Sequence, residues 1–257
     1  MKFTLLALIA LMVFPLFCAT TDDWTTTASG LEYKITQHGT GIQPKVGDGV
    51  KVHYIGTLED GTEFDNSYSR NKPIAFELGA GRVIRGWDEG IALMHVGDKA
   101  TFRIPAELGY GDRAVGPIPA NATLLFDVEL VDVLRPVPYD TTHKVLVTTE
   151  SGLKFYLIEK GPGRQAVAGD RATVHYTGYL PDGSIFDSSI TRDQVFKFVI
   201  GMGKVIPGWD EGVALMHVGD KARLEIPYNL AYGEKGIEGI IPPKATLIFD
   251  IQLISLD

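Results

Sequence analysis

The sequence has a single cysteine and no excess of basic residues. Cys18 is the one cysteine among 257 residues, so no disulfide within the chain can contribute to its stability. Lysine and arginine number 24 against 32 aspartates and glutamates, giving a formal net charge of −8. This surplus of negative charge argues against nucleic acid or an anionic lipid surface as the main partner. Hydrophobic residues at 45% and charged residues at 22% are typical of a globular chain.

Metal-ligand and nucleophile motifs are missing as well. The six histidines include no pair spaced three or four residues apart and have no cysteine partners, so we expect no metal site and no cofactor. The segments Gly79–Gly81 and Gly201–Gly203 are not followed by a third glycine at the spacing of the G-x-G-x-x-G motif, and they do not lie in the βαβ pattern of a dinucleotide site. His53 and His175 fall on the outward phase of predicted strands, where we expect them to be solvated.

The longest apolar run lies at the start of the sequence. Lys2 precedes the nearly unbroken apolar stretch Phe3–Phe17, which is followed by small or polar residues. This pattern predicts a secretory signal peptide over residues 1–20, with an uncleaved N-terminal anchor as the alternative. The mature chain is then expected to have no membrane span. Because Ile254–Asp257 is not a lumenal retention signal, we expect a location in the secretory pathway, extracellular or periplasmic.

An internal repeat divides the remaining chain into two domains. The string GWDEGIALMHVGDKA at residues 86–100 returns as GWDEGVALMHVGDKA at residues 208–222. The openings SGLEYKI and SGLKFYLI mark the two domain starts. We therefore predict a first domain over residues 24–134, a linker over 135–145 that contains two prolines, and a second domain over 146–257.

Within each copy the hydrophobic period is mainly that of β-strands. Apolar residues alternate with polar ones around Tyr54 and Phe126, and again around Tyr176 and Phe249, which predicts half-buried strands. One helical stripe per copy interrupts this pattern, at Trp87, Ile91 and Met94 in the first, and it should end near Gly97 or Gly219. We expect an α+β fold in which each domain is a curved antiparallel sheet of about five strands around one short helix.

A set of aromatic and aliphatic residues with one acid repeats in both copies. Core packing explains such residues more often than a binding site does, and the pattern alone leaves both interpretations open. The first set is Tyr54, Phe64, Asp65, Phe76, Val83, Ile84, Trp87, Tyr110 and Phe126, and the second is Tyr176, Phe186, Asp187, Phe198, Val205, Ile206, Trp209, Tyr232 and Phe249.

The ordered motifs resemble those of the FKBP-type peptidyl-prolyl isomerases. In the first copy they are VHYIGTLEDGTEFDNSYSRNKP, VIRGWDEG, LGYG and ATLLFDVEL; in the second they are VHYTGYLPDGSIFDSS, VIPGWDEG and LAYGEKGIEGIIPPKATLIFD. The resemblance covers nearly the whole chain after the apolar start. It implies two tandem FKBP-like domains, each with a pocket between sheet and helix that binds proline-containing polypeptides and macrolides such as rapamycin.

Carried over position by position, the resemblance implies two pockets of catalytic and substrate-binding residues. Each indole would form the floor beneath a proline ring, and a backbone segment and a tyrosine hydroxyl would hold the substrate carbonyls. The implied catalytic residues are Tyr54, Phe64, Asp65, Trp87, Tyr110, Phe126, Tyr176, Phe186, Asp187, Trp209, Tyr232 and Phe249. The implied substrate-binding residues are Arg70, Phe76, Val83, Ile84, Ile118, Arg192, Phe196, Phe198, Val205, Ile206, Ile240 and Ile241.

The copies depart from the family pattern unequally. The first has Ile74 where an aromatic residue is common and a loop after Tyr110 that is one residue shorter, so we expect it to have a thinner apolar rim and the lower activity.

The expected function is a secreted or lumenal prolyl isomerase that assists protein folding. One alternative is a chaperone or docking module that binds proline segments with little turnover. Another is a regulatory subunit that docks on a membrane receptor or channel through its surfaces.

Overall fold

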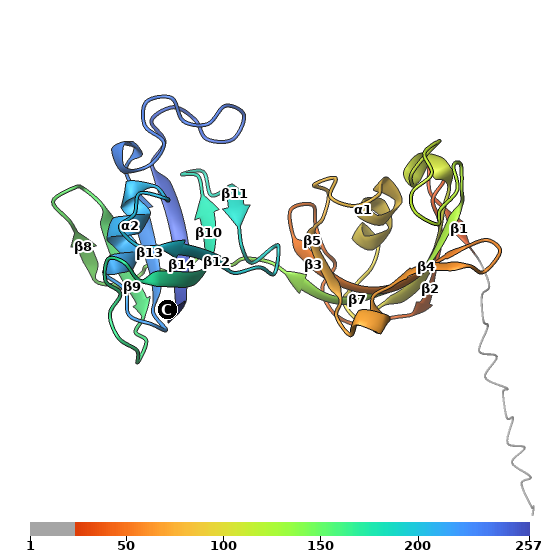
Figure 1. The fold of residues 1–257 in the computed structure, drawn as a ribbon, viewed down its shortest axis with the longest axis horizontal. Coiled ribbons are helices and arrows are strands. Elements are labelled where there is room, and N and C mark those ends of the chain that lie inside the picture. Colours follow the sequence, from red (N-terminus) through yellow and green to blue (C-terminus); the bar gives the residue numbers. More distant parts are fainter. Residues whose placement is uncertain (1–23) are drawn as a thin grey trace, which may run out of the picture.

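A computed structural model describes residues 24–257 as two similar units joined by a short linker (Figure 1). Each unit is a curved antiparallel sheet with one α-helix against its concave face, which confirms the α+β prediction. The signal peptide predicted for residues 1–20 lies outside the described residues. No helix in the described part is long and apolar enough to cross a membrane.

The first sheet follows the order β1-β2-β6-β7-β3-β4, and β5 also pairs with β3. It has seven strands rather than about five because the first strand is a two-residue extension and two short strands share one neighbour. The strands are β1 Thr25–Thr26, β2 Glu32–Gln37, β3 Gly49–Leu58, β4 Glu63–Asn66, β5 Ile74–Glu77, β6 Lys99–Ile104 and β7 Leu124–Leu134. The helix is α1, Arg85–Ala92, and the 3₁₀ turns are η1, Tyr68–Arg70, and η2, Ala106–Leu108.

The second sheet repeats this topology in the order β11-β10-β14-β13-β9-β8, with β12 paired to β10. Its strands are β8 Leu146–Thr148, β9 Lys154–Glu159, β10 Arg171–Tyr179, β11 Ile185–Ser188, β12 Phe196–Val199, β13 Lys221–Ile226 and β14 Leu247–Leu256. The helix is α2, Pro207–Ala214, and one 3₁₀ turn, η3, covers Tyr228–Leu230.

The predicted strand alternation is confirmed, whereas the helix ends earlier than its apolar stripe. Val50, Val52 and Tyr54 on β3 are buried, whereas Lys51, His53 and Ile55 between and after them are half-buried. Helix α1 ends at Ala92, so Met94 is fully buried from the following turn rather than from the helix. Gly97 adopts a φ of 91° in the turn that leads into β6.

The linker is held at both of its ends. Arg135 donates to both carboxylate oxygens of Asp48 in the first unit at 2.8 and 2.5 Å. The Tyr139 N–H donates to Asp250 of the second unit at 2.7 Å. The two linker residues that bind the two units, Arg135 and Tyr139, are therefore only four residues apart.

His53 and His175 are half-buried, not solvated as expected from their strand phase. Their Nδ1 atoms lie 2.9 and 3.0 Å from the hydroxyl oxygens of Ser67 and Ser189, residues that are themselves buried.

Candidate functional sites in the two units

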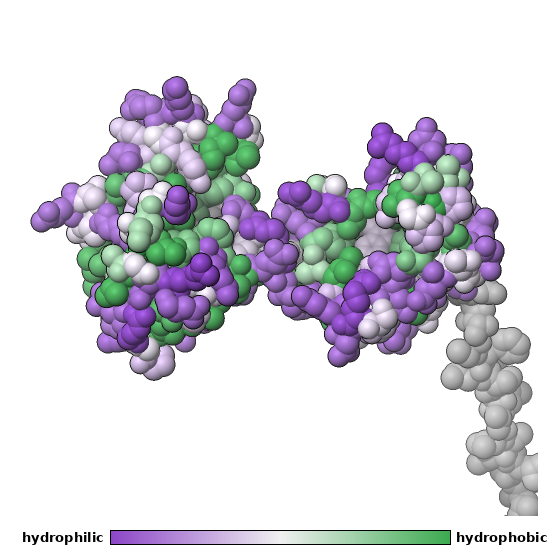
Figure 2. Space-filling view, in the orientation of Figure 1, coloured by the Kyte–Doolittle hydropathy of each residue, from purple (hydrophilic) through white to green (hydrophobic). Residues whose placement is uncertain are grey.

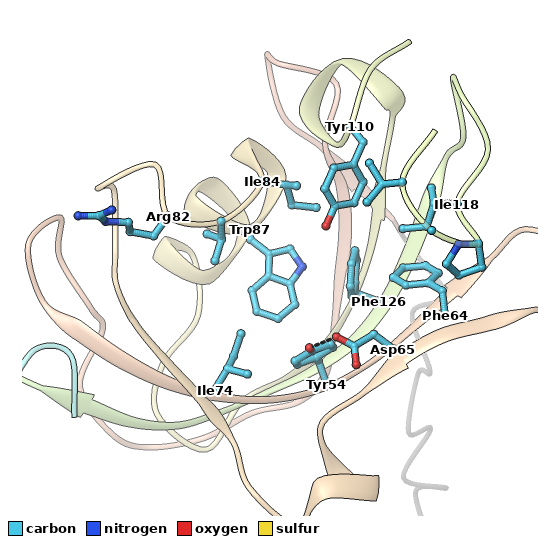
Figure 3. A pocket seen from close by; sticks show the side chains of 14 residues that line it. Tyr54, Phe64, Asp65, Ile74, Arg82, Ile84, Trp87, Tyr110, Ile118 and Phe126 are labelled. Carbon is cyan, nitrogen blue, oxygen red and sulfur yellow. Dashed lines mark hydrogen bonds between the residues drawn. The ribbon is translucent and has the colours of Figure 1, made fainter. Parts of the chain in front are cut away.

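A cavity of about 360 Å³ lies between α1 and the concave face of the first sheet. Figure 2 shows its mouth as a hollow bordered by hydrophobic residues. Trp87, which is only 3% exposed, forms its floor (Figure 3). The Tyr54 and Phe126 rings stand nearly perpendicular to the indole at centroid distances of 4.9 and 5.2 Å. Edge-to-face packing of this kind fixes the ring positions and leaves a dry apolar floor.

One carboxylate positions the loop that forms the second wall. Asp88, in the first turn of α1, accepts hydrogen bonds from the N–H groups of Gly79 and Gly81 at 2.8 and 3.2 Å. Both glycines have positive φ, a conformation that few other residues adopt without strain. This loop leads directly into Val83 and Ile84, which line the cavity. In the second unit Asp210 makes the same two bonds, to Gly201 and Gly203.

A polar cluster closes one side of the first cavity. The Tyr54 hydroxyl donates to one oxygen of Asp65, and Arg70 donates to the other at 2.5 Å and to the Tyr54 hydroxyl oxygen at 3.0 Å. Burial alone would raise the pKa of Asp65, but the hydrogen bonds from Arg70 and Tyr54 outweigh it and the pKa lies below its ordinary value. Burial and the bond to Asp65 raise the pKa of Tyr54 to about 12. The cluster therefore holds an ionised carboxylate beside a neutral phenol at neutral pH.

The rim of the first cavity is built by the loop after β6. The Tyr110 hydroxyl points into the cavity (Figure 3). Val115 and Ile118 exchange two backbone hydrogen bonds of 2.9 Å, and this tight turn brings both side chains to the opening. The expectation of a thinner apolar rim in the first copy is wrong, because the shorter loop turns inward over the cavity.

The second cavity is smaller, at about 230 Å³. Phe196 occupies the position of Ile74 and packs against Tyr176 and Trp209, with both centroid distances at 5.8 Å. Ile241 lies in the core and Ile240 is 55% exposed, and neither lines the cavity. The activity order inferred from the rim therefore loses its structural support.

Most residues implied by the resemblance converge on these cavities. Phe76 and Phe198 do not line them but lie against the indoles of Trp87 and Trp209, with centroids 5.9 and 5.6 Å apart. Arg70 and Arg192 act from outside the walls through Asp65 and Asp187. The lining residues in the first cavity are Tyr54, Phe64, Asp65, Val83, Ile84, Trp87, Tyr110, Ile118 and Phe126, and those in the second are Tyr176, Phe186, Asp187, Phe196, Val205, Ile206, Trp209, Tyr232 and Phe249.

Sequence reasoning missed a basic residue in each cavity. Arg82 and Lys204 line the first and second cavity, and each precedes the Val-Ile pair of its copy. Their shared place in the repeat was the available signal. Val115, Gly116 and Pro117 were also missed, because the turn that brings them to the opening is formed by backbone pairing.

The charge state of these cavities should not change near neutral pH. No histidine lines either cavity in the described part of the chain. Burial raises the pKa of Tyr54 to about 12, so its hydroxyl stays neutral, and the lowered pKa of Asp65 keeps its carboxylate ionised at neutral pH. We expect any activity on an uncharged peptide to stay constant from about pH 6 to about pH 9 and to fall only as acid protonates carboxylates. Rates measured across this range would check it; a bell-shaped profile would contradict it.

The fold and the cavities define a class of protein with two α+β domains, each with a pocket lined mainly by aromatic and aliphatic residues. The family model described as FKBP-type peptidyl-prolyl cis-trans isomerase matches residues 40–131 and again residues 163–254. The chain therefore belongs to this family and carries two of its domains.

Several curated proteins are similar to this chain. Mouse peptidyl-prolyl cis-trans isomerase FKBP10 is 43% identical over 208 residues, which is 80% of this chain and 34% of that protein. Human peptidyl-prolyl cis-trans isomerase FKBP9 is 38% identical over 212 residues, which is 82% of this chain and 35% of that protein. FK506-binding protein 2 of Debaryomyces hansenii is 56% identical over 99 residues, which is 38% of this chain and 73% of that protein. The chain spans about a third of the length of the FKBP9 and FKBP10 proteins.

Proposed function

We propose that both pockets catalyse cis-trans isomerisation of X-Pro bonds in polypeptides. The observation that carries this proposal is the buried indole floor, walled by aromatic edges and facing a hydroxyl on the rim, which occurs in both units. The floor and walls accept the flat apolar face of a proline ring. Polar groups that receive the adjacent carbonyls lie only at the edge.

Such a pocket accelerates the reaction without breaking a covalent bond. Rotation about the imide bond meets a barrier of roughly 18 to 20 kcal/mol because the twisted state loses amide resonance. A dry aromatic cavity favours the less conjugated twisted state over both planar states, which is catalysis by differential binding. The absence of a nucleophile and of an acid-base pair from the sequence motifs agrees with this chemistry.

Two donors at the edge are placed to hold the substrate carbonyls. The Ile84 N–H makes no hydrogen bond within the described residues, and neither does the Ile206 N–H of the second unit. The hydroxyls of Tyr110 and Tyr232 supply the second donor in each pocket. Asp65 orients Tyr54 and pairs with Arg70, so we assign it an orienting role and not a direct role on the rotating carbonyl.

The cellular role that we propose is folding or remodelling of exported proteins. The apolar start of the sequence supports delivery to a secretory, lumenal, extracellular or periplasmic location. Proline-containing polypeptides are the proposed substrates, and macrolides such as rapamycin are the proposed inhibitors. The alternative of a binding module without turnover predicts that the pockets capture prolyl peptides and leave the exchange rate unchanged.

Removing the rim tyrosines tests the proposal. We expect Tyr110→Ala and Tyr232→Ala each to lower the contribution of its own domain by about tenfold, since each deletes a ring of the rim and its hydrogen bond to a substrate carbonyl. The measurement is NMR exchange of a Leu-Pro peptide by the two-domain protein, with and without rapamycin. Tyr68→Ala is the control, because Tyr68 is similarly exposed but outside the pocket. Peptide binding without rapamycin-sensitive acceleration would refute the isomerase proposal.

A further inference from the structure

A third cavity, of about 520 Å³, lies between the two units and is lined by both. We call it the interdomain cleft and define it by Asp48, Glu77 and Arg82 of the first unit, Arg135 of the linker, and Phe186, Asp187 and Arg192 of the second. Polar residues of the two units face each other where the units meet (Figure 2). The cleft is therefore a polar space between two apolar pockets.

The interdomain cleft shares wall residues with both pockets. Phe186 and Asp187 line the cleft and also the second pocket. Arg82 lines the cleft and also the first pocket, and in Figure 3 its side chain extends away from the indole floor. A chain that leaves the second pocket past Phe186 therefore enters a space whose far wall belongs to the first unit.

Direct contacts hold the walls of the cleft in place. Lys51 and Asp193 form an ion pair of 2.9 Å between the units. Gly49 lies so close to the other unit that an added Cβ would be 2.2 Å from the Thr191 carbonyl oxygen. Together with the tethered linker, these contacts give the cleft a defined width.

The groups that face the cleft match the chemistry of a polypeptide backbone. Asp48 is neutralised by Arg135 and Asp187 by Arg192. The side chains of Glu77 and Arg82 have no hydrogen-bond or ion-pair partner among the described residues, so one acceptor and one donor remain free. Strand β11, which contributes Phe186 and Asp187, pairs only with β10 in the described sheet and leaves its other edge open to an added strand.

We infer that the interdomain cleft is an extended substrate site for the second pocket. The residues that flank the proline in an unfolded polypeptide lie along β11 and contact Glu77 and Arg82 of the first unit. The first domain thereby increases the affinity of the second for long substrates. This inference rests on the proposed isomerase function and adds that the substrate is an extended chain rather than a short prolyl peptide.

The test compares a prolyl tetrapeptide with a peptide of about twelve residues, because five flanking residues extend about 17 Å from the proline. The protein is the two-domain chain with Tyr110→Ala, so that turnover reports on the second pocket. We expect Glu77→Ala to raise the KM for the long peptide by about fivefold, with kcat unchanged and the tetrapeptide unaffected. We expect Arg82→Ala, which also changes a wall of the first pocket, to raise the same KM by about fivefold. Arg85→Ala is the matched control, since Arg85 is exposed nearby and lines neither pocket nor cleft.

A merely structural role of Glu77 or Arg82 in the first unit would not change the kinetics of the second. Equal KM values for the long peptide in all variants would overturn the inference. If the tetrapeptide were still turned over, the isomerase proposal would stand. No turnover of either peptide would overturn both. As a further readout, we expect Lys51→Glu to raise the KM for the long peptide and the charge reversal Lys51→Glu/Asp193→Lys to restore it.

Discussion

Asp250→Ala is expected to destabilise the second domain by about 3 kcal/mol, because it leaves a largely buried arginine without its counter-charge. Arg223 donates to the two Asp250 oxygens at 2.6 and 2.8 Å, and the Tyr139 N–H donates to the same carboxylate at 2.7 Å. Asp250 is only 4% exposed. The substitution therefore removes a fold-stabilising pair and also releases the linker from the second domain.

The first domain supplies a matched control at the same place in the repeat. Asp127 corresponds to Asp250 but is exposed and accepts one hydrogen bond, from the Thr101 hydroxyl at 2.7 Å. We expect Asp127→Ala to cost less than about 1 kcal/mol, the usual range for an exposed hydrogen bond. Hydrogen exchange measured by mass spectrometry separates the domains. Equal destabilisation by both substitutions would contradict the assignment.

Gly56→Ala is expected to abolish most activity of the first pocket. A Cβ on Gly56 would lie 2.6 Å from the Phe64 ring and 2.9 Å from the Phe126 ring. These rings form the wall of the pocket, so the methyl group displaces Phe126 from its position against Trp87 and Phe64 from its position against Phe126. Overpacking of this kind costs about 1 to 3 kcal/mol, and we expect the catalytic contribution of the first pocket to fall at least about tenfold because the aligned wall is lost.

The duplication again provides controls for this prediction. Gly178→Ala should impair only the second pocket, where the added Cβ would lie 2.5 Å from Phe186 and 2.8 Å from Phe249. Ile55→Ala changes the opposite face of β3 and should leave peptide exchange close to normal. Exchange is measured by NMR in a Tyr232→Ala background for the first pocket and a Tyr110→Ala background for the second. Unchanged turnover in Gly56→Ala would show that the wall tolerates the shift.

Much of the fold could be read from the sequence because its signals are local and repeated. The period of two around Tyr54 and Phe126 places these residues on the concave face of strands, and they lie there. The repeat located the same positions in the second copy. The end of the helix was harder to predict from the sequence. Met94 is buried like the other residues of the apolar stripe, although the helix ends at Ala92.

The pocket residues were predictable as types and less so as positions. Phe76 and Phe198 are aromatic, as pocket residues often are, but they pack against the indoles of Trp87 and Trp209 without lining the pockets. Ile241 and its counterpart Ile118 are both buried in the core, yet only Ile118 also lines a cavity. The backbone pairs that close the two loops, Val115 with Ile118 and Ile237 with Ile241, carry no distinctive sequence pattern.

The sequence by itself determined that this chain is a tandem of two α+β domains, since periodicity and duplication are properties of the residue order, and the resemblance of its motifs to one family implied an aromatic pocket in each domain. Only the tertiary structure decided that Asp250 is buried with Arg223 while its counterpart Asp127 is exposed, and that a polar cleft between the units shares wall residues with both pockets. The physical reason is that the burial of a residue and the contact between two domains depend on which residues pack against each other, and those residues are distant from one another in the sequence.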